Sequence, residues 1–355
     1  MDFFKCQLVG SHYNDQNIFE KETVNIFNKT WQYVCRESDL SAVGSYITAT
    51  LGTEPIIVLR ASDGTLRSFH NVCPHRGARM LSGNGSCKGI VCPYHSWSFT
   101  ESGCVKHIPK EHWFDDLQVE SLHLKAASVD VWRGFVFASP VEGAESLEGW
   151  LEGYTEYLDD YEFPYEEMTE IARFRFDENV NWKLLVENYV EDYHFAYVHP
   201  KTLGAFNFNG VRTIPCGPHI QIPMPYKDIP PNEHSKYLWE PGGVSRQGFV
   251  FPLLTVQPAR NHLSLFVFKP ISSSRTVIEI SVFQTDVQQQ NFPIDKEILR
   301  ADIFNDMEED FVVCRNLQAN TRSTHFSINA LAGEHESGVK HFQETWWSFM
   351  KGCTN

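Results

Sequence analysis

Two short segments of the chain each bring one cysteine and one histidine close together. The first is Cys73-Pro74-His75 and the second is Cys92-Pro93-Tyr94-His95. In each segment a tight loop can present one thiolate and one imidazole toward the same point. Two thiolates and two imidazoles are enough to hold a metal centre. The spacing therefore predicts a metal site within residues 73–95.

The residues alone leave the kind of centre open. Two Cys and two His suit a tetrahedral zinc ion. The same four ligands suit a [2Fe–2S] cluster of the Rieske type, in which two Cys bind one iron and two His bind the other. The neighbouring residues favour the cluster, because a proline stiffens each segment and several glycines between them let the chain turn back sharply. A loop with incidental Cys and His residues is the least favoured interpretation.

A second group of possible metal ligands lies near residue 190. Glu187, Glu191 and His194 recur at i, i+4 and i+7, so a helix over residues 181–197 would carry them on one face. His199 can reach the same ion if the helix loosens before the proline that follows it. Two His and one carboxylate form the facial triad of non-haem Fe(II) oxygenases, which leaves three coordination positions open. The alternative is a solvated polar face on an exposed helix.

The carboxylate of such a triad has to come from elsewhere in the chain, because a carboxylate on the same helix face is better placed behind the histidines. A long helix is predicted over residues 293–321, and it carries an acidic run. Asp310 is the best donor in this run, and Glu309 and Asp306 compete with it.

The elements that must position these groups fall into two regions. Residues 40–140 consist of short alternating runs separated by Gly, Asp and Asn turns, which predict an all-β domain with the Cys/His segments on adjacent loop tips. Residues 141–355 combine strands with longer helices, and residues 1–39 are expected to pack on this second domain. The predicted fold class is α+β, with an all-β domain and a second domain whose antiparallel sheet is flanked by helices.

Hydrophobic periodicity gives the expected elements of both domains. Strands are expected at residues 45–51, 55–60, 66–71, 97–100, 127–138, 171–180, 249–256, 263–269 and 276–285. Helices are expected at residues 17–31, 142–160, 181–197, 293–321 and 339–350. Residues 200–245 are rich in Gly, Pro and aromatic residues, and we expect them to form loops over a pocket.

Composition limits the possible partners and compartments. The net charge of −15 argues against nucleic acid or an anionic membrane as a partner. No run of apolar residues approaches the length of a membrane span, and the N-terminus lacks the layout of a signal peptide. The nine cysteines follow no regular framework, so reduced thiols in a cytoplasmic protein are expected, Cys87 and Cys104 included.

The motifs resemble those of a known family. Cys-Pro-His-Arg-Gly at residues 73–77 and Cys-Pro-Tyr-His-Ser-Trp-Ser-Phe at residues 92–99 resemble the Rieske segments of ring-hydroxylating and related oxygenases. Asn-Trp-Lys at residue 181, Glu-Asn at 187, Glu-x-Tyr-His-x4-His from 191, and Glu-Asp at 309 with Gln318 resemble the catalytic domain of the same α subunits. The chain is thus similar to a Rieske non-haem iron oxygenase α subunit across residues 71–318.

The resemblance implies both cofactors and their ligands. It implies a [2Fe–2S] cluster held by Cys73, His75, Cys92 and His95. It also implies a mononuclear Fe(II) held by His194, His199 and Asp310 in a helix-grip catalytic domain. Such systems draw electrons from NAD(P)H through a separate flavin or iron–sulfur reductase, sometimes with a ferredoxin, and the expected assembly is a homotrimer.

One position departs from the commonest family pattern. Three residues before the first His ligand many ring dioxygenases have Asp, whereas this chain has Glu191 followed by Asp192. In the family this carboxylate bridges a cluster His to an iron His across a subunit interface. A carboxylate between two imidazoles fixes their tautomers and gives electrons a short path. We assign the bridge to Glu191, because on a continuous helix Asp192 would be turned about 100° away.

The glutamate resembles the branch that contains carnitine oxygenase and choline monooxygenase. That likeness implies monooxygenation of a small substrate, with N-dealkylation or C–N cleavage of a quaternary ammonium compound. Aromatic residues near the iron segment could form a cation–π cage, or equally could belong to the core. These residues are Tyr189, Tyr193, Phe195, Tyr197, Phe206 and Phe208. The main alternative is a dioxygenase that cis-dihydroxylates aromatic rings, and the more distant ones are a Rieske electron carrier and a zinc-stabilised binding module.

Overall fold

The computed structural model describes residues 7–159, 163–204, 206–227, 244–259, 261–328 and 330–351. The chain divides into two compact units, of which one is Glu22–Trp150 and the other joins Met1–Lys21 to Leu151–Asn355. The sequence placed these boundaries after residues 39 and 140. The difference arises because strand β1 (Gln32–Arg36) pairs with β10 (Phe135–Ser139), so residues 22–39 belong to the β unit. Only residues up to 21 join the unit that contains Leu151–Asn355, which is called the catalytic unit below. This corrects the expectation that the whole of residues 1–39 packs on that unit.

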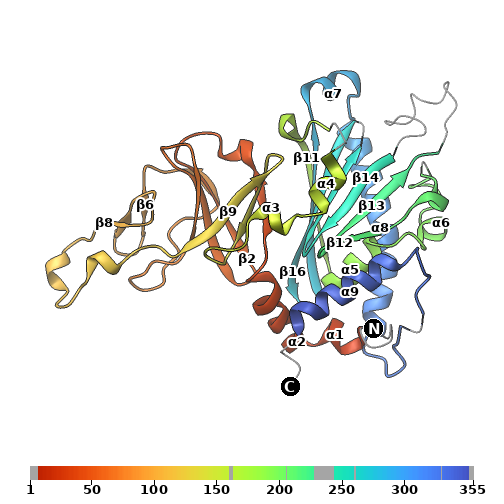
Figure 1. Cartoon of the computed structure of the whole chain (residues 1–355), viewed down its shortest axis with the longest axis horizontal. Helices are drawn as coiled ribbons and strands as arrows, with labels where there is room; N and C mark the ends of the chain where they lie inside the picture. Colours follow the sequence, from red (N-terminus) through yellow and green to blue (C-terminus); the bar gives the residue numbers. More distant parts are fainter. Residues whose placement is uncertain are drawn as a thin grey trace. The chain divides into compact units, whose positions relative to one another are not determined.

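The β unit contains two antiparallel sheets (Figure 1). The larger has the strand order β1-β10-β9-β4-β3-β2-β5, and the smaller has the order β6-β7-β8. The remaining strands are β2 (Ser45–Leu51), β3 (Glu54–Arg60), β4 (Leu66–His70), β5 (Asn84–Ser86), β6 (Ile90–Val91), β7 (Ser98–Phe99), β8 (Val105–His107) and β9 (Ala126–Trp132). The two Cys/His segments follow β4 and β6. A core that includes Phe69, Trp97 and Phe99 packs around both cysteines.

Two segments expected to be single strands are hairpins. Residues 127–138 turn at Arg133 and Gly134, whose φ values of 48° and 74° give the left-handed two-residue turn that suits the twist of paired strands. Residues 249–256 turn at a cis Phe251-Pro252 bond between β14 (Val244–Val250) and β15 (Leu254–Ala259). In both cases the strands continue the same hydrophobic pattern, which conceals the turn.

The catalytic unit is built on one antiparallel sheet with the order β11-β17-β16-β15-β14-β13-β12. The strands not yet located are β11 (Thr169–Glu178), β12 (Ile214–Cys216), β13 (His219–Pro225), β16 (His262–Ser272) and β17 (Arg275–Gln284). Strands β12 and β13 lie in the region expected to be loops. Pro223 and Pro225 concealed β13 in the sequence, but they lie beyond the part that pairs with β12, where a strand edge tolerates proline.

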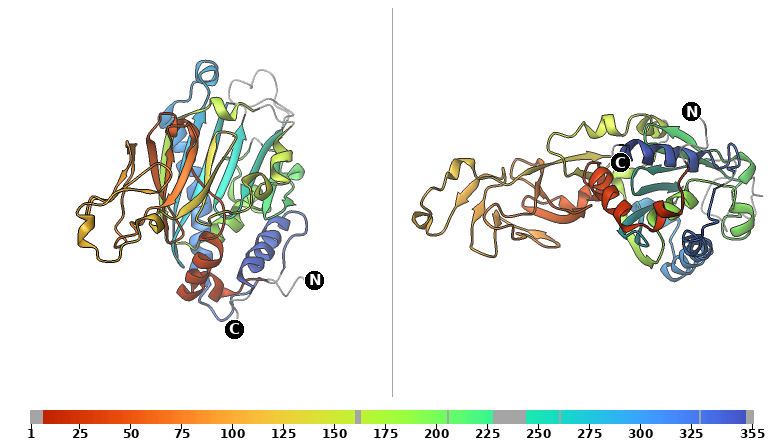
Figure 2. Two further views of the ribbon diagram at one scale, coloured as in Figure 1. Left: turned by 60° about the vertical axis from the view of Figure 1, so that its left-hand side comes forward. Right: turned by 90° about the horizontal axis from the view of Figure 1, so that it is seen from below.

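Several helices of the described residues lie against this sheet. Those that bear on the site are α5 (Trp182–Tyr189), α8 (Lys296–Asn320) and α9 (Ser337–Met350). In Figure 1 the blue C-terminal helices lie alongside the sheet, and Figure 2 shows the same packing from two further directions. The expected helix over residues 142–160 is divided into α3 (Leu147–Trp150) and α4 (Tyr154–Asp159). No helix of the described residues is long and apolar enough to cross a membrane.

Helix α5 is fixed by contacts along its length. Asn181 caps it by accepting from the Lys183 N–H, and the Asn181 N–H donates to Gln318 Oε1 on α8 at 2.7 Å. The Cys314 thiol of α8 donates to the Leu184 carbonyl at 3.8 Å. On the α9 side, Trp182 meets Phe342 edge to face at 5.5 Å. Helix α5 is therefore held between two helices that lie far from it in the sequence.

A glycine sets how closely α9 approaches the end of α5. A Cβ atom on Gly338 would lie 2.0 Å from the Val190 carbonyl oxygen. We expect Gly338→Ala to destabilise the catalytic unit by about 1–3 kcal/mol through overpacking, although alanine is favoured in helices by about 1 kcal/mol. Urea unfolding measures this change. Gly149→Ala is the matched control, since its Cβ would meet only the Ser146 hydroxyl at 3.1 Å. A stabilised Gly338→Ala variant would contradict the close packing.

Candidate metal centres

The Cys73 segment is held by a buried asparagine that ends strand β4. Asn71 accepts from the Met80 and Leu81 N–H groups at 2.8 and 3.1 Å, and its own amide donates to the Leu81 carbonyl at 2.7 Å. Inside this loop the Cys73 N–H donates to Ala78, and the Gly77 N–H returns to Cys73 at 2.8 Å. The loop therefore keeps its shape through its own hydrogen bonds.

The second segment closes in a similar way. The Cys92 N–H donates to the Trp97 carbonyl at 2.8 Å, and the Ser96 N–H donates to the Cys92 carbonyl at 3.0 Å. Ser96 adopts a left-handed φ of 58°, which is uncommon for a residue other than glycine. This turn directs His95 toward the first segment.

The two imidazoles of the segments face each other. His75 Nδ1 and His95 Nδ1 are 3.1 Å apart, and neither ring has a carboxylate partner among the described residues. Trp97 stacks on His75 with centroids 4.7 Å apart and an interplanar angle of 8°, and Tyr94 stacks on His95 at 3.7 Å. Burial and the neighbouring His95 lower the pKa of His75, which favours the neutral form that binds metals.

The donor arrangement fits a two-iron cluster better than one zinc ion. Cys73 and Cys92 are buried, and burial raises the pKa of the Cys73 thiol, so a metal is needed to hold the thiolate there. Although all four residues are described, no three of their ligand atoms lie within 4.8 Å of one another. A tetrahedral zinc ion would need that convergence. A pair of facing imidazoles and a separate pair of neighbouring thiols match ligation by two irons.

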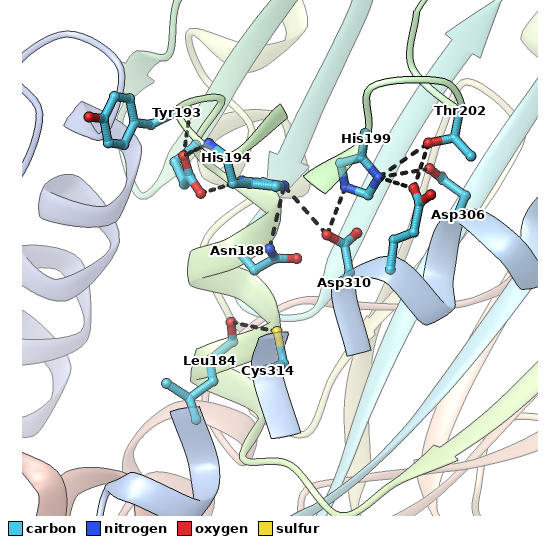
Figure 3. Close-up of polar contacts among 11 residues, drawn as sticks. Leu184, Asn188, Tyr193, His194, His199, Thr202, Asp306, Asp310 and Cys314 are labelled. Atoms are coloured by element: carbon cyan, nitrogen blue, oxygen red, sulfur yellow. Dashed lines mark hydrogen bonds and ion pairs between the residues drawn. The ribbon is translucent and has the colours of Figure 1, made fainter. Parts of the chain in front are cut away.

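The structure brings His194, His199 and Asp310 together from three places. The first His lies between α5 and the short helix α6 (Phe195–Val198), the second directly follows α6, and Asp310 lies on α8. Asp310 Oδ1 is 2.8 Å from His199 Nε2 and 3.4 Å from His194 Nε2. One ligand atom from each residue lies within 4.8 Å of the others (Figure 3).

Carboxylates on the far side of each imidazole set its orientation. Glu191 Oε1 contacts His194 Nδ1, and Glu309 Oε2 lies 2.8 Å from His199 Nδ1. Asp306 is 3.4 Å from the same His199 nitrogen, and the Thr202 hydroxyl donates to Glu309 at 2.7 Å. Each Nδ1 can thus carry its proton toward a carboxylate, while each Nε2 is directed at Asp310.

The protonation of the group shows that it is suited to a cation. Burial opposes a charge on His194, yet the contacts with Asp310 and Glu191 raise its pKa to about 9. Burial also opposes the charge of Asp310, but its bonds to His194 and His199 lower its pKa. Burial, with Asp310 nearby, raises the pKa of Asp306 to about 6. Protons hold these anions together, and a divalent cation can replace them.

The helix expected over 181–197 is interrupted. Helix α5 ends at Tyr189, and the chain then turns, because the Glu191 carboxylate accepts from the N–H groups of Tyr193 and His194 and competes with helical hydrogen bonds. Glu187, Glu191 and His194 therefore do not share a helix face. Glu187 lies away from the metal group and accepts from the Tyr13 hydroxyl at 2.9 Å.

The turn also places the Asp192 side chain differently from what a continuous helix predicts. Its expected 100° offset assumed a continuous helix, whereas its carboxylate is buried and contacts His335 Nδ1 at 2.9 Å. Sequence reasoning did not find His335 or Thr202, which lie in irregular segments without a recognisable pattern. Asn188 belongs to the Glu-Asn motif at residue 187, but the sequence assigned it no role. The structure places its amide 3.4 Å from His194 Nε2.

The aromatic residues near the iron segment separate into two groups. Tyr193 and Tyr197 are 55% and 78% exposed, and Figure 3 shows Tyr193 on the far side of His194 from Asp310. Phe195 lies nearer, with its ring 6.0 Å from that of His199 and 5.6 Å from that of Phe208. Among these residues Phe195 therefore lies beside the histidines, and Phe208 packs against Phe195.

Comparison with known proteins agrees with this arrangement. Residues 30–122 match the model of the Rieske [2Fe-2S] domain, and residues 165–352 match that of the ring hydroxylating alpha subunit (catalytic domain). The carnitine monooxygenase oxygenase subunit of Escherichia coli K12 is 28% identical over 341 residues, which cover 93% of this chain and 90% of that protein.

Two further relatives are similar. The glycine betaine monooxygenase oxygenase subunit of Chromohalobacter salexigens is 35% identical over 196 residues, covering 54% of this chain and 43% of that protein. The crystal structure of the quaternary ammonium Rieske monooxygenase CntA in complex with substrate L-carnitine superposes with a TM-score of 0.80. It shares 23% identity, with 98% of this chain and 99% of that chain covered.

Glu187 gives a prediction about stability. Burial raises its pKa from 4.5 to about 7, so between these pH values the folded protein holds a proton that the unfolded chain releases. The free energy of unfolding should therefore fall as the pH rises through this window. Glu187→Gln removes this titration and should reduce the fall by on the order of 2 kcal/mol, as measured by urea unfolding at pH 5 and pH 7.5.

The control for this experiment is Glu297→Gln, which removes an exposed carboxylate at the start of α8. It should keep the pH dependence of the unmodified protein. Equal pH dependence in the Glu187→Gln variant and the unmodified protein would mean that Glu187 is already ionised in the folded state.

Proposed function

The chain belongs to the family of ring-hydroxylating oxygenase α subunits that carry a Rieske [2Fe–2S] domain, and we propose that it hydroxylates a small quaternary ammonium compound. The observation that carries the oxygenase assignment is the convergence of two imidazoles and one carboxylate within 4.8 Å. A Rieske electron carrier without an iron site would not need this group, and a zinc-stabilised module would need only the Cys/His centre.

We assign the ligands residue by residue. Cys73, Cys92, His75 and His95 hold the [2Fe–2S] cluster, and His194, His199 and Asp310 hold the mononuclear iron. Bound there, an Fe(II) ion would supply dioxygen activation at its three open coordination positions. Glu309 and Asp306 contact the outer nitrogen of His199, so their proposed role is to orient its ring.

Electrons are proposed to arrive from a separate reductase. Glu191 already contacts the outer nitrogen of His194. In a homotrimer its carboxylate would accept a second imidazole, His95 of a neighbouring subunit, and so connect the two centres. The Glu191 side chain is 11% exposed, and its second oxygen accepts from the N–H groups of Tyr193 and His194, so a neighbour's imidazole would have to add to these contacts.

The substrate class rests on the relatives and on charge. Both named relatives are monooxygenases of trimethylammonium compounds by name, which favours monooxygenation over cis-dihydroxylation of aromatic rings. The net charge of −15 is compatible with a cationic substrate. Phe195 packs with its ring 6.0 Å from that of His199, and an aromatic ring beside the site would attract a quaternary ammonium group.

The ligand assignment predicts a selective loss of iron. His199→Ala should lower the iron content from about three to about two atoms per chain, because one facial ligand is lost while the cluster keeps all four of its ligands. Iron analysis and the visible spectrum of the cluster measure this. His325→Ala, which changes an exposed histidine, should keep all the iron. Loss of the cluster together with the mononuclear iron would overturn the two-site assignment.

The substrate class can be tested with matched compounds. With electrons from NADH and a flavin reductase, L-carnitine, glycine betaine or choline should give oxygen uptake coupled to a hydroxylated or demethylated product. An analogue with carbon in place of the ammonium nitrogen should have a KM about 10-fold higher, because it loses the cation–π attraction. The mass of the product distinguishes substrate oxidation from oxygen uptake that is not coupled to product formation. Turnover of benzoate and other aromatic acids alone would reject the cationic substrate.

A further inference from the structure

A carboxylate at the buried position of Asp192 is energetically unfavourable. Its side chain is only 2% exposed, and its Oδ1 atom has no hydrogen-bond partner among the described residues. Burying a carboxylate with one oxygen unsatisfied destabilises a protein unless another interaction compensates. The interaction present here is the contact of Oδ2 with His335 Nδ1 at 2.9 Å.

The backbone of Asp192 is fixed as well. Its N–H donates to the His335 carbonyl at 3.4 Å, and its carbonyl accepts from the Phe195 N–H, the first residue of α6, at 3.2 Å. Together with the carboxylate contact, these bonds hold the residue at three points. Two of the three lead to His335.

His335 itself belongs to the turn that directly precedes α9. Its N–H donates to the Ala332 carbonyl at 2.9 Å, and directly after it Gly338 packs against the Val190 carbonyl. The turn over residues 332–338 therefore lies against the break that follows α5. That break contains Glu191 and His194, which flank Asp192 on either side.

We propose that His335 and Asp192 form a positioning pair that fixes the turn carrying Glu191, so that the Glu191 carboxylate stays on His194 Nδ1. This inference rests on the proposed function, in which Glu191 orients an iron ligand and conducts electrons. It assigns to Asp192 a role within its own subunit. For Asp192 the rival role of bridging to a neighbouring subunit is disfavoured, because its side chain is 2% exposed, whereas that of Glu191 is 11% exposed.

Two nearly isosteric variants of His335 distinguish the effect of its N–H donor from the effect of its packing. His335→Asn keeps an N–H donor close to the position of Nδ1, whereas His335→Leu removes it. The test uses the protein with its cluster intact and its mononuclear iron removed, titrated with Fe(II) and read by the EPR signal of the nitric oxide adduct. Loss of an orienting partner typically weakens metal binding about 10-fold, so His335→Leu should weaken Fe(II) binding about 10-fold and His335→Asn less than about 2-fold.

A double variant tests whether the pair acts through Glu191. Glu191→Gln should itself weaken Fe(II) binding, and adding His335→Leu should weaken it by no more than about 2-fold further, since coupled residues are not additive. Unchanged binding in His335→Leu, or fully additive losses in the double variant, would overturn the positioning role. If Asn and Leu at residue 335 gave equal losses, the role of the donor would be rejected in favour of packing alone.

The outcomes for the proposed function are separate. If the unmodified protein bound no Fe(II), the proposed iron site would fail, whatever His335 does. If Fe(II) bound normally and only the His335 variants behaved unexpectedly, the iron site would stand and the positioning pair would fail. Thermal unfolding of every variant identifies a general loss of folding, and the His335→Asn variant provides the folded reference.

Discussion

The catalytic unit depends on bringing one partly buried carboxylate between two imidazoles. Asp310 and His199 lie 111 positions apart in the sequence, and their side chains meet at 2.8 Å. Such a contact exists only if α5 and α8 pack in one register. The Asn181–Gln318 hydrogen bond and the Cys314–Leu184 contact set that register. The packing of Phe311 against Phe176 of β11 at 5.4 Å also holds α8 on the sheet. A shift of one turn along either helix would carry Asp310 out of reach.

The same contact explains the acidic surroundings of the histidines. Each imidazole has one nitrogen toward Asp310 and the other toward a further carboxylate, Glu191 for His194 and Glu309 for His199. This arrangement prevents the rings from flipping and directs both Nε2 atoms inward. The excess of negative charge would be unfavourable in a buried site without a cation. Metal binding at the proposed iron site would therefore compete with protonation of the same groups.

The two centres differ in how far the sequence could predict them. The proposed cluster ligands lie in two short segments. The sequence predicts this site because proline, glycine and the ligands are neighbours in the chain. The pairing of Asp310 with His194 and His199 is long-range, so it needed the family resemblance. The interruption after Tyr189 was not predicted, since periodicity continues through the turn. His335 could not be predicted at all, because nothing near it in the sequence indicates that it meets Asp192. Strand β13 was missed for the opposite reason, as its prolines suggested a loop although its inward residues alternate.

The interruption after α5 follows from the coordination geometry. On an unbroken helix, residues five apart such as His194 and His199 point in different directions, about 140° apart around the axis. The turn over residues 190–194 and the short α6 return both rings to one side, 5.3 Å apart between centroids. A turn has fewer internal hydrogen bonds than a helix, so its shape has to be set by its neighbours. Glu191 supplies two such bonds from within, and the segment before α9 supplies others through His335 and the close approach of Gly338. The spacing of the two histidines, the proposed iron ligands, thus explains why the segment before α9 packs against the end of α5.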